Sequence, residues 1–193
     1  MIPTYLNDLH LDVVLVAYTS NIEAYLQESN GNEHIVDSET LKISGFVTST
    51  FGQPEELELK YFDVQNPNRK DFSLLQIDNG VISSVAPTKR CDCAVITDQV
   101  LSFIEFKANA LSSNTKTIKS NYKSAMKQLQ VTIDIFKTGV ADLGCSLSTF
   151  RSLEAFVCFR RGYPRVTTSE MTYRTHFAAR THVPLSFEPT KVL

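Results

Sequence analysis

Apolar residues gather in short runs along the middle of the chain, and short polar segments separate these runs. The clearest pair is Cys91 to Ile96 and Val100 to Phe106, on either side of Thr97-Asp98-Gln99. Both runs are rich in β-branched and aromatic residues and are bounded by turn residues, which predicts strands. The pattern therefore predicts two neighbouring strands joined by a tight polar turn.

Further strands are predicted on both sides of this pair. Between Glu55 and Phe62, apolar residues alternate with charged ones, the pattern of a half-buried strand. Asp78-Asn79-Gly80 predicts the turn of a β-hairpin, because Asn-Gly accepts positive φ angles. The strands expected in this way are Leu41–Phe51, Glu55–Phe62, Phe72–Ile77, Val81–Val85, Leu153–Phe159 and Val183–Phe187. Those before Asp92 form a mostly antiparallel meander, and Pro184 confines the last strand to a sheet edge.

Helical spacing of apolar residues is clearest between Asn114 and Lys137, where one buried stripe recurs every three or four positions. Weaker patterns of the same kind predict helices at Tyr5–Glu28 and Thr168–Arg180. Polar composition predicts loops at Ser29–Glu39, Asp63–Asp71 and Thr138–Thr149.

Length and composition limit the kind of protein this can be. With 193 residues and 42% hydrophobic content, we expect one domain over residues 1–193, of the α/β class. Four cysteines are too few for a disulfide scaffold, and a zinc site is disfavoured because only Cys91 and Cys93 are close in sequence. No apolar run approaches the roughly 20 residues that span a bilayer. We therefore expect a soluble, cytoplasmic protein without a membrane partner.

Three charged residues interrupt the two central strands. Side chains two positions apart in a strand share a face, so Glu105 and Lys107 project together while Ile104 and Phe106 point the other way. Asp92, on the neighbouring strand, is expected beside Glu105. Charged groups in such strands cost several kcal/mol each unless they are paired or hold a metal.

Asp92, followed after twelve residues by Glu105-Phe106-Lys107, resembles the bipartite signature of the PD-(D/E)xK nuclease superfamily. The resemblance implies a restriction-endonuclease-like core, with a mixed sheet flanked by helices and an N-terminal antiparallel meander. It further implies that Asp92 and Glu105 bind Mg²⁺ (or Mn²⁺) and that Lys107 orients or activates the attacking water. Arg90-Cys91 stands before Asp92 where the signature has Pro, which weakens the match slightly.

The same resemblance suggests two more site residues. Many members of the superfamily carry an acidic residue on the first helix, here Glu23, and a Gln on the helix that follows the E-x-K strand, here Gln128. Gln130 is an alternative to Gln128. The competing interpretations are a solvated helix charge at Glu23 and an ordinary polar helix residue at Gln128. The implied activity is that of a Mg²⁺-dependent DNA endonuclease, and small members of the superfamily often act in defence against phage and other mobile DNA.

Basic residues are placed to contact nucleic acid. Lys116, Lys119, Lys123 and Lys127 line one side of the predicted helix at Asn114–Lys137, and its first turns are expected near the site. Arg160 and Arg161 end the strand at Leu153–Phe159, and the turn after them contains the aromatic Tyr163. A plain solvated helix face and a charged turn are the competing interpretations.

The net charge of −2 hides an asymmetry between the two halves of the chain. Residues 1–88 carry a net charge of −9, whereas residues 89–193, which hold the motif, carry +7. This suits a phosphate-facing surface on the second half. It also suits attraction between the halves, or a protein partner for the acidic half.

Two functions of different classes stay open at this point. The first is the Mg²⁺-dependent nuclease. The second is a catalytically inactive nuclease fold that acts as a binding module through a protein partner. In that case Lys107 forms a structural salt bridge at a sheet edge. The sequence does not decide between DNA and RNA, between sequence-specific and non-specific binding, or between a monomer and a homodimer.

Overall fold

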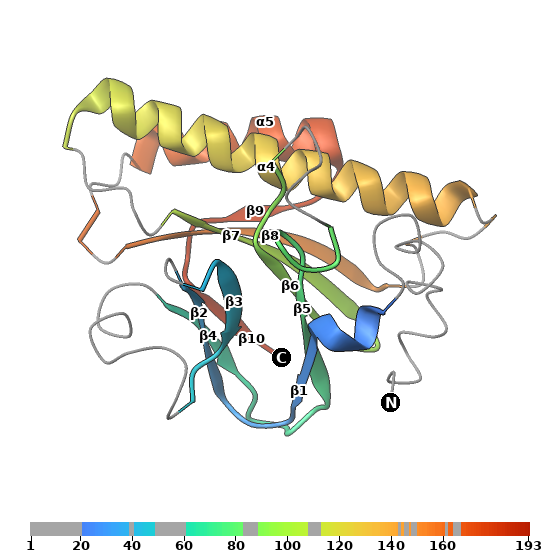
Figure 1. Cartoon of the computed structure of the whole chain (residues 1–193). Coiled ribbons are helices and arrows are strands. Elements are labelled where there is room, and N and C mark those ends of the chain that lie inside the picture. Colours follow the sequence, from blue (N-terminus) through green and yellow to red (C-terminus); the bar gives the residue numbers. More distant parts are fainter. Residues whose placement is uncertain are drawn as a thin grey trace.

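The computed structural model describes residues 21–38, 41–48, 61–82, 89–107, 113–142, 144, 147, 150–160, 162–163 and 167–193. Within these residues the chain builds three layers (Figure 1): two helices, a six-stranded sheet and a four-stranded sheet. The six-stranded sheet is the middle layer, so both of its faces are covered.

The six-stranded sheet is mixed. Its order is β1 (Leu26–Ser29), β5 (Phe72–Gln76), β6 (Cys93–Ile96), β7 (Val100–Lys107), β8 (Ser152–Phe159) and β9 (Leu185–Ser186). Neighbours from β1 to β7 pair antiparallel, whereas β7, β8 and β9 run parallel. Parallel neighbours need a crossover connection. Helices α4 (Thr115–Asp142) and α5 (Thr167–Thr181) supply the two crossovers.

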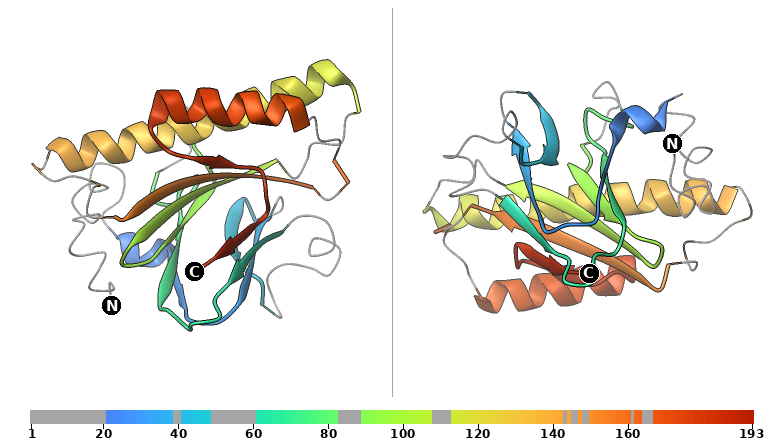
Figure 2. Two further views of the ribbon diagram at one scale, coloured as in Figure 1. Left: turned by 180° about the vertical axis from the view of Figure 1, so that it is seen from behind. Right: turned by 90° about the horizontal axis from the view of Figure 1, so that it is seen from below.

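Both helices cover the same face of this sheet, as Figure 2 shows from behind. The buried stripe of α4 packs on apolar side chains of β6, β7 and β8, for example with Phe136 against Phe103 at a ring-centroid distance of 5.2 Å. A second contact joins the helices, because the Tyr122 hydroxyl donates a buried hydrogen bond to Glu170 of α5 at 2.6 Å. These contacts hold α4 on the sheet and α5 against α4.

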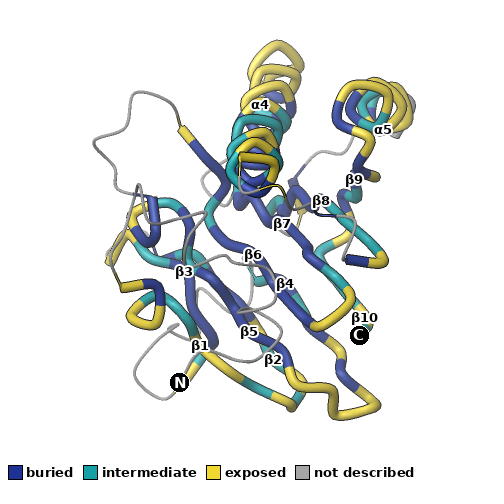
Figure 3. Tube along the Cα trace, turned by 90° about the vertical axis from the view of Figure 1, so that its right-hand side faces the viewer, coloured by how far each residue is buried: buried dark blue, intermediate teal, exposed yellow. Residues whose placement is uncertain are grey.

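The other face packs against the second sheet, whose order is β10 (Thr190–Val192), β4 (Tyr61–Gln65), β2 (Glu33–Ser38) and β3 (Ile43–Phe46). An apolar core joins the two sheets, with Phe62 of β4 against Phe156 of β8 at 5.0 Å between ring centroids. Figure 3 shows the buried segments of the strands beneath the two helices. Short η1 (Ile22–Tyr25) precedes β1 and buries Ile22 in the core on the helix side.

The expected class is confirmed at the level of an α/β protein with a mixed sheet flanked by helices. The expected strands at Phe72–Ile77, Cys91–Ile96, Val100–Phe106 and Leu153–Phe159 match β5 to β8, and the helix at Asn114–Lys137 matches α4. The last helix and the edge strand after it also match, since β9 ends the six-stranded sheet. Among the described residues, no helix is both long and apolar enough to cross a membrane.

The N-terminal predictions are wrong in part. The helix expected at Tyr5–Glu28 gives way to β1 from Leu26, with only one 3₁₀ turn before it, and residues 1–20 lie outside the described residues. The loops expected at Ser29–Glu39 and Asp63–Asp71 contain β2 and the end of β4. These polar strands form because each has a pairing partner distant in the sequence. The meander is therefore divided between two sheets.

The hairpin expected at Asp78-Asn79-Gly80 is also wrong, because β5 pairs with β1 and β6. Residues 77–82 form a compact turn in which the N–H groups of Val81 and Ile82 donate to the carbonyls of Gln76 and Ile77. Asn79 does adopt positive φ (54°). A Cβ on Gly80 would lie 2.3 Å from the Gln76 carbonyl oxygen, so this turn requires glycine. Residues 83–85 lie outside the described residues.

Candidate active site

The alternation of side chains along β7 sets the site. Ile104 and Phe106 point into the core between the two sheets, so Glu105 and Lys107 point to the opposite face, toward α4. Glu105 is almost completely buried, with 1% of its side chain exposed, whereas Lys107 at the end of the strand keeps 19%. The expected common orientation of Glu105 and Lys107 is observed.

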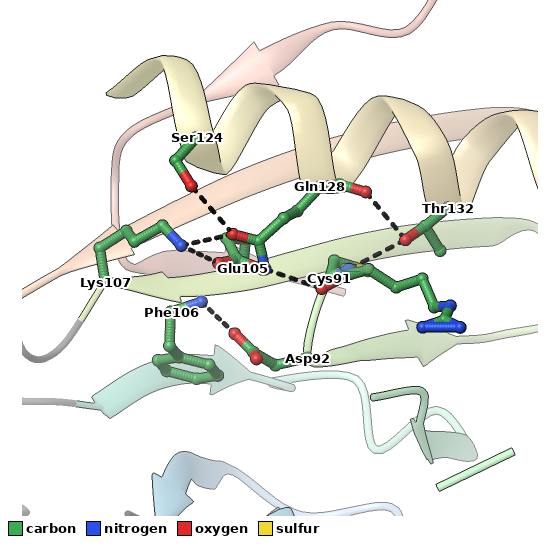
Figure 4. A network of polar contacts seen from close by, with 9 residues as sticks. Cys91, Asp92, Glu105, Phe106, Lys107, Ser124, Gln128 and Thr132 are labelled. Atoms are coloured by element: carbon green, nitrogen blue, oxygen red, sulfur yellow. Dashed lines mark hydrogen bonds and ion pairs between the residues drawn. The ribbon is translucent and has the colours of Figure 1, made fainter. Parts of the chain in front are cut away.

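Lys107, Glu105 and Gln128 form one hydrogen-bonded group between β7 and α4 (Figure 4). The Lys107 ammonium group donates to Glu105 Oε1 at 2.5 Å and to Gln128 Oε1 at 2.6 Å. The amide nitrogen of Gln128 donates to Glu105 Oε2 at 3.2 Å and to the carbonyl of Arg90 at 2.9 Å. The Ser124 hydroxyl also donates to Gln128 Oε1, at 3.3 Å. Every polar atom of the Gln128 side chain is thus engaged.

Asp92 immediately precedes β6, where the pairing of β6 with β7 ends. The register pairs Cys93 with Ile104, so Asp92 comes opposite Glu105, one position beyond the end of the ladder. Its carboxylate Oδ2 accepts a hydrogen bond from the backbone N–H of Phe106 at 2.6 Å. Phe106 packs between the two sheets, and in Figure 4 the Asp92 carboxylate lies on the same side of β7 as the Phe106 ring. The carboxylates of Asp92 and Glu105 therefore do not share the face of the sheet that strand alternation predicts for them. Figure 4 shows the Asp92 carboxylate directed at Phe106, while Lys107, Glu105 and Gln128 point toward one another beneath α4.

The backbone around Asp92 is anchored on two sides. The Asp92 carbonyl accepts from the N–H groups of Ile77 and Asp78, in the turn that requires Gly80. On the helix side, the Cys91 N–H donates to the Thr132 hydroxyl at 2.9 Å, and that hydroxyl donates to the Gln128 carbonyl at 3.0 Å. The start of β6 is therefore fixed to the same helix turn that carries Gln128.

Electrostatics make the two carboxyl groups costly to ionise. Burial raises the pKa of Glu105 to about 8, although the neighbouring Lys107 ammonium lowers it. Burial also raises the pKa of Asp92 well above its usual value, and the negative charge of Glu105 adds to the shift. Asp37 on β2 contributes a further negative charge to both. Sequence reasoning missed Asp37, because it stands in a polar stretch that carried no sign of a strand.

The donor set suits a hard divalent cation. Asp92, immediately before β6, and Glu105 on β7 carry carboxylate oxygens, and Mg²⁺ is commonly held by only one or two carboxylates together with water and substrate phosphate. Within the described residues, no three His, Cys, Asp or Glu side chains gather closely enough to hold a metal ion by themselves. Asp92 and Glu105 would hold such a cation only together with ligands from outside the described residues.

The remaining predicted site residues differ in their placement. Glu23 is exposed on η1 and takes no part in the hydrogen bonds and ion pairs described for Asp92, Glu105, Lys107 and Gln128. Lys116, Lys119, Lys123 and Lys127 are all exposed on α4. Gln130, the alternative to Gln128, makes only a surface contact with Asp134 at 3.5 Å.

Helix geometry separates the four lysines. At about 100° per residue, Lys127 lies about 100° from Gln128 around the helix, Lys116 about 120° and Lys123 about 140°. Lys119, nine residues before Gln128, lies on the opposite side of the helix. It shares its side with Lys137, whose ammonium group donates to the Thr181 carbonyl at the end of α5 at 2.6 Å. Lys119 therefore faces the α5 flank, away from the site.

At the end of β8, Arg160 is partly exposed and follows Phe159, which pairs with Lys107. Arg161 lies outside the described residues. Tyr163 is buried, stacks on Phe159 at a ring-centroid distance of 4.9 Å and accepts a hydrogen bond from Asn121 at 2.9 Å. The Tyr163 ring is thus part of the core and offers no surface on which a base could stack.

Comparisons with known proteins add nothing to this description. No family model, curated protein or solved structure matches the chain. The function is therefore inferred from the geometry of the site.

Proposed function

We propose that the protein is a nuclease dependent on Mg²⁺ or Mn²⁺, with a restriction-endonuclease-like core, and that it acts as a DNA endonuclease. One observation carries the proposal. A buried carboxylate, an ammonium group and an amide face one another across β7 and α4, with a second carboxylate immediately before the adjacent strand β6. Burying such a group is costly, so a purely structural element gains little from it.

Each side chain has a distinct task in this proposal. Asp92 and Glu105 would hold the divalent cation, which when bound lowers the pKa of a coordinated water and offsets charge on the phosphate. Lys107 would donate hydrogen bonds to the nucleophilic water or to a phosphate oxygen. Gln128 would position Lys107, because its own orientation is fixed by the Arg90 carbonyl and Glu105.

The surface beside the site suits a polyanion. Lys127 lies on the exposed side of α4, about 100° around the helix from Gln128, with Lys116 and Lys123 farther around it, and Arg160 follows the strand that pairs with β7. Positive side chains of this kind contact phosphates without reading sequence. This supports a nucleic acid substrate and gives no reason to expect base-specific recognition.

A second function is favoured by a different observation. Both oxygens of Glu105 already accept hydrogen bonds from the chain's own donors, Lys107 and Gln128. A satisfied network of this kind suits a nuclease fold that has lost catalysis and binds a protein partner through its acidic first half. The two functions differ in whether the lysine is needed for chemistry.

Cleavage assays decide between them. Wild-type protein should cut plasmid or single-stranded DNA with Mg²⁺ or Mn²⁺, and Lys107→Ala should lower the rate by about 10²-fold or more, the usual loss for a group that positions a reacting proton. Asp92→Asn and Glu105→Gln should lower cleavage at least as strongly. Product bands on a gel, measured against time, give the rates.

The chain provides a matched control in Lys191. Its ammonium group pairs with Glu154 at 2.5 Å, in a partly buried ion pair outside the site whose glutamate is more exposed than Glu105. Lys191→Ala should cost comparable stability and leave cleavage unchanged. Should the wild type cut no nucleic acid with either metal, while it binds a specific protein, the binding module would replace the nuclease.

A further inference from the structure

The Lys107 ammonium group lies between two oxygen atoms of the site. Glu105 Oε1 is 2.5 Å from it and Gln128 Oε1 is 2.6 Å from it. Carboxylate and amide oxygens are also the ligands that hard divalent cations prefer. The ammonium group thus lies between two oxygen atoms of the kind that bind hard divalent cations.

The other contacts of Glu105 restrict where a cation can bind. Glu105 has 1% of its side chain exposed, and its Oε2 atom accepts from the Gln128 amide nitrogen. Oε1 faces the partly exposed Lys107 and is the oxygen that a cation entering from that side meets first, and the Lys107 ammonium group occupies it. A dication and an ammonium group at one carboxylate oxygen repel each other strongly where water is excluded.

We infer that Lys107 is a built-in competitor of the divalent cation, so that cation binding and the Lys107–Glu105 ion pair exclude each other. Lys107 is the last residue of β7 and keeps 19% of its side chain exposed, so its ammonium group has a path out of the pair. On leaving, it becomes available to a phosphate or a water. This inference rests on the proposed function. It means that binding of the cation and release of Lys107 from Glu105 occur together.

Equilibrium binding of Mn²⁺, followed by the loss of its free electron paramagnetic resonance signal, tests the competition without any turnover. Lys107→Met should bind Mn²⁺ at least about tenfold more tightly than the wild type, because one repelling charge is removed and Oε1 is freed. Lys191→Met removes a second ion-paired lysine, outside the site, and should bind Mn²⁺ as the wild type does. Glu105→Gln should bind it much more weakly.

A second measurement needs no variant. Acetylation of each lysine by a trace of acetic anhydride, read by mass spectrometry, reports how available its amine is. Saturating Mg²⁺ should raise the labelling of Lys107 several-fold and leave that of Lys191 unchanged.

The outcomes distinguish the competition by Lys107 from the proposed nuclease function. If the wild type binds Mn²⁺ while Lys107→Met binds it equally or less tightly, or if Mg²⁺ leaves Lys107 labelling unchanged, the competition is overturned and the nuclease proposal stands. If neither the wild type nor Lys107→Met binds Mn²⁺, both are overturned.

Discussion

Glu105 is the residue on which the site depends, because it is a carboxyl group with almost no contact with water. Its pKa of about 8 reflects burial that the Lys107 ammonium only partly offsets. In the unfolded chain the same group ionises near 4.5. The folded protein therefore binds a proton at Glu105 more tightly than the unfolded chain does.

This difference predicts how stability depends on pH. Between 4.5 and about 8, the folded state tends to hold the Glu105 proton and the unfolded state does not, so the free energy of unfolding should fall as pH rises. Glu105→Gln lacks this proton and should show a flatter dependence. Urea unfolding of both proteins across this range without divalent cations measures the difference, in which the titrating groups remote from Glu105 cancel. A difference that grows in favour of the wild type with rising pH would contradict the raised pKa.

The residues of the site were predictable where local geometry fixes them. Glu105 and Lys107 share a face because strand side chains alternate, and Gln128 rather than Gln130 meets them because two helix positions differ by about 200° around the axis. Asp37 was not predictable. Its approach to Asp92 and Glu105 depends on packing of one sheet on the other, which no local pattern encodes.

At the scale of elements, α4 connects the site with its surroundings. One side of this helix carries Gln128 to Glu105, the opposite side meets α5 through Lys137, and exposed lysines lie between the two. A polyanion at the site would therefore meet Lys127 and not Lys119.

This orientation predicts unequal effects of two similar substitutions. Lys127→Ala should weaken binding of duplex DNA and lower the slope of log affinity against log salt by about 1, the effect of losing one phosphate contact. Lys119→Ala should change neither the affinity nor the slope. Fluorescence anisotropy titrations at several salt concentrations, without divalent cations to prevent cleavage, give both values. Equal losses from the two variants would show that the nucleic acid does not approach from the Gln128 side.

Elements with a strong local pattern were predicted well. The strands β6 and β7, their tight turn and α4 follow from apolar runs, turn residues and helical spacing. The turn at residues 77–82 was mistaken for a hairpin because Asn79-Gly80 fits both, and only the pairing of β5 with β1 and β6 decides. Leu26–Ser29 was mistaken for the end of a helix because its strand character comes from its partner, β5.

At the scale of the molecule, two sheets replace the single meander that the sequence suggested. The second sheet joins β10, near the end of the chain, to β4. The sequence of neither segment alone indicates such long-range pairing. The charge asymmetry gains a local meaning, because Asp37 and Asp78 from the acidic half raise the pKa of Glu105. Part of that negative charge thus acts on the site, where a divalent cation would offset it.

The most direct test of the whole account is the anomalous diffraction signal of Mn²⁺ in crystals of the wild-type protein. We predict one strong peak within bonding distance of the Asp92 and Glu105 carboxylates, with the Lys107 ammonium group displaced from Glu105. Absence of a peak there from fully soaked crystals, with the Lys107–Glu105 pair intact, would contradict a metal-dependent active site.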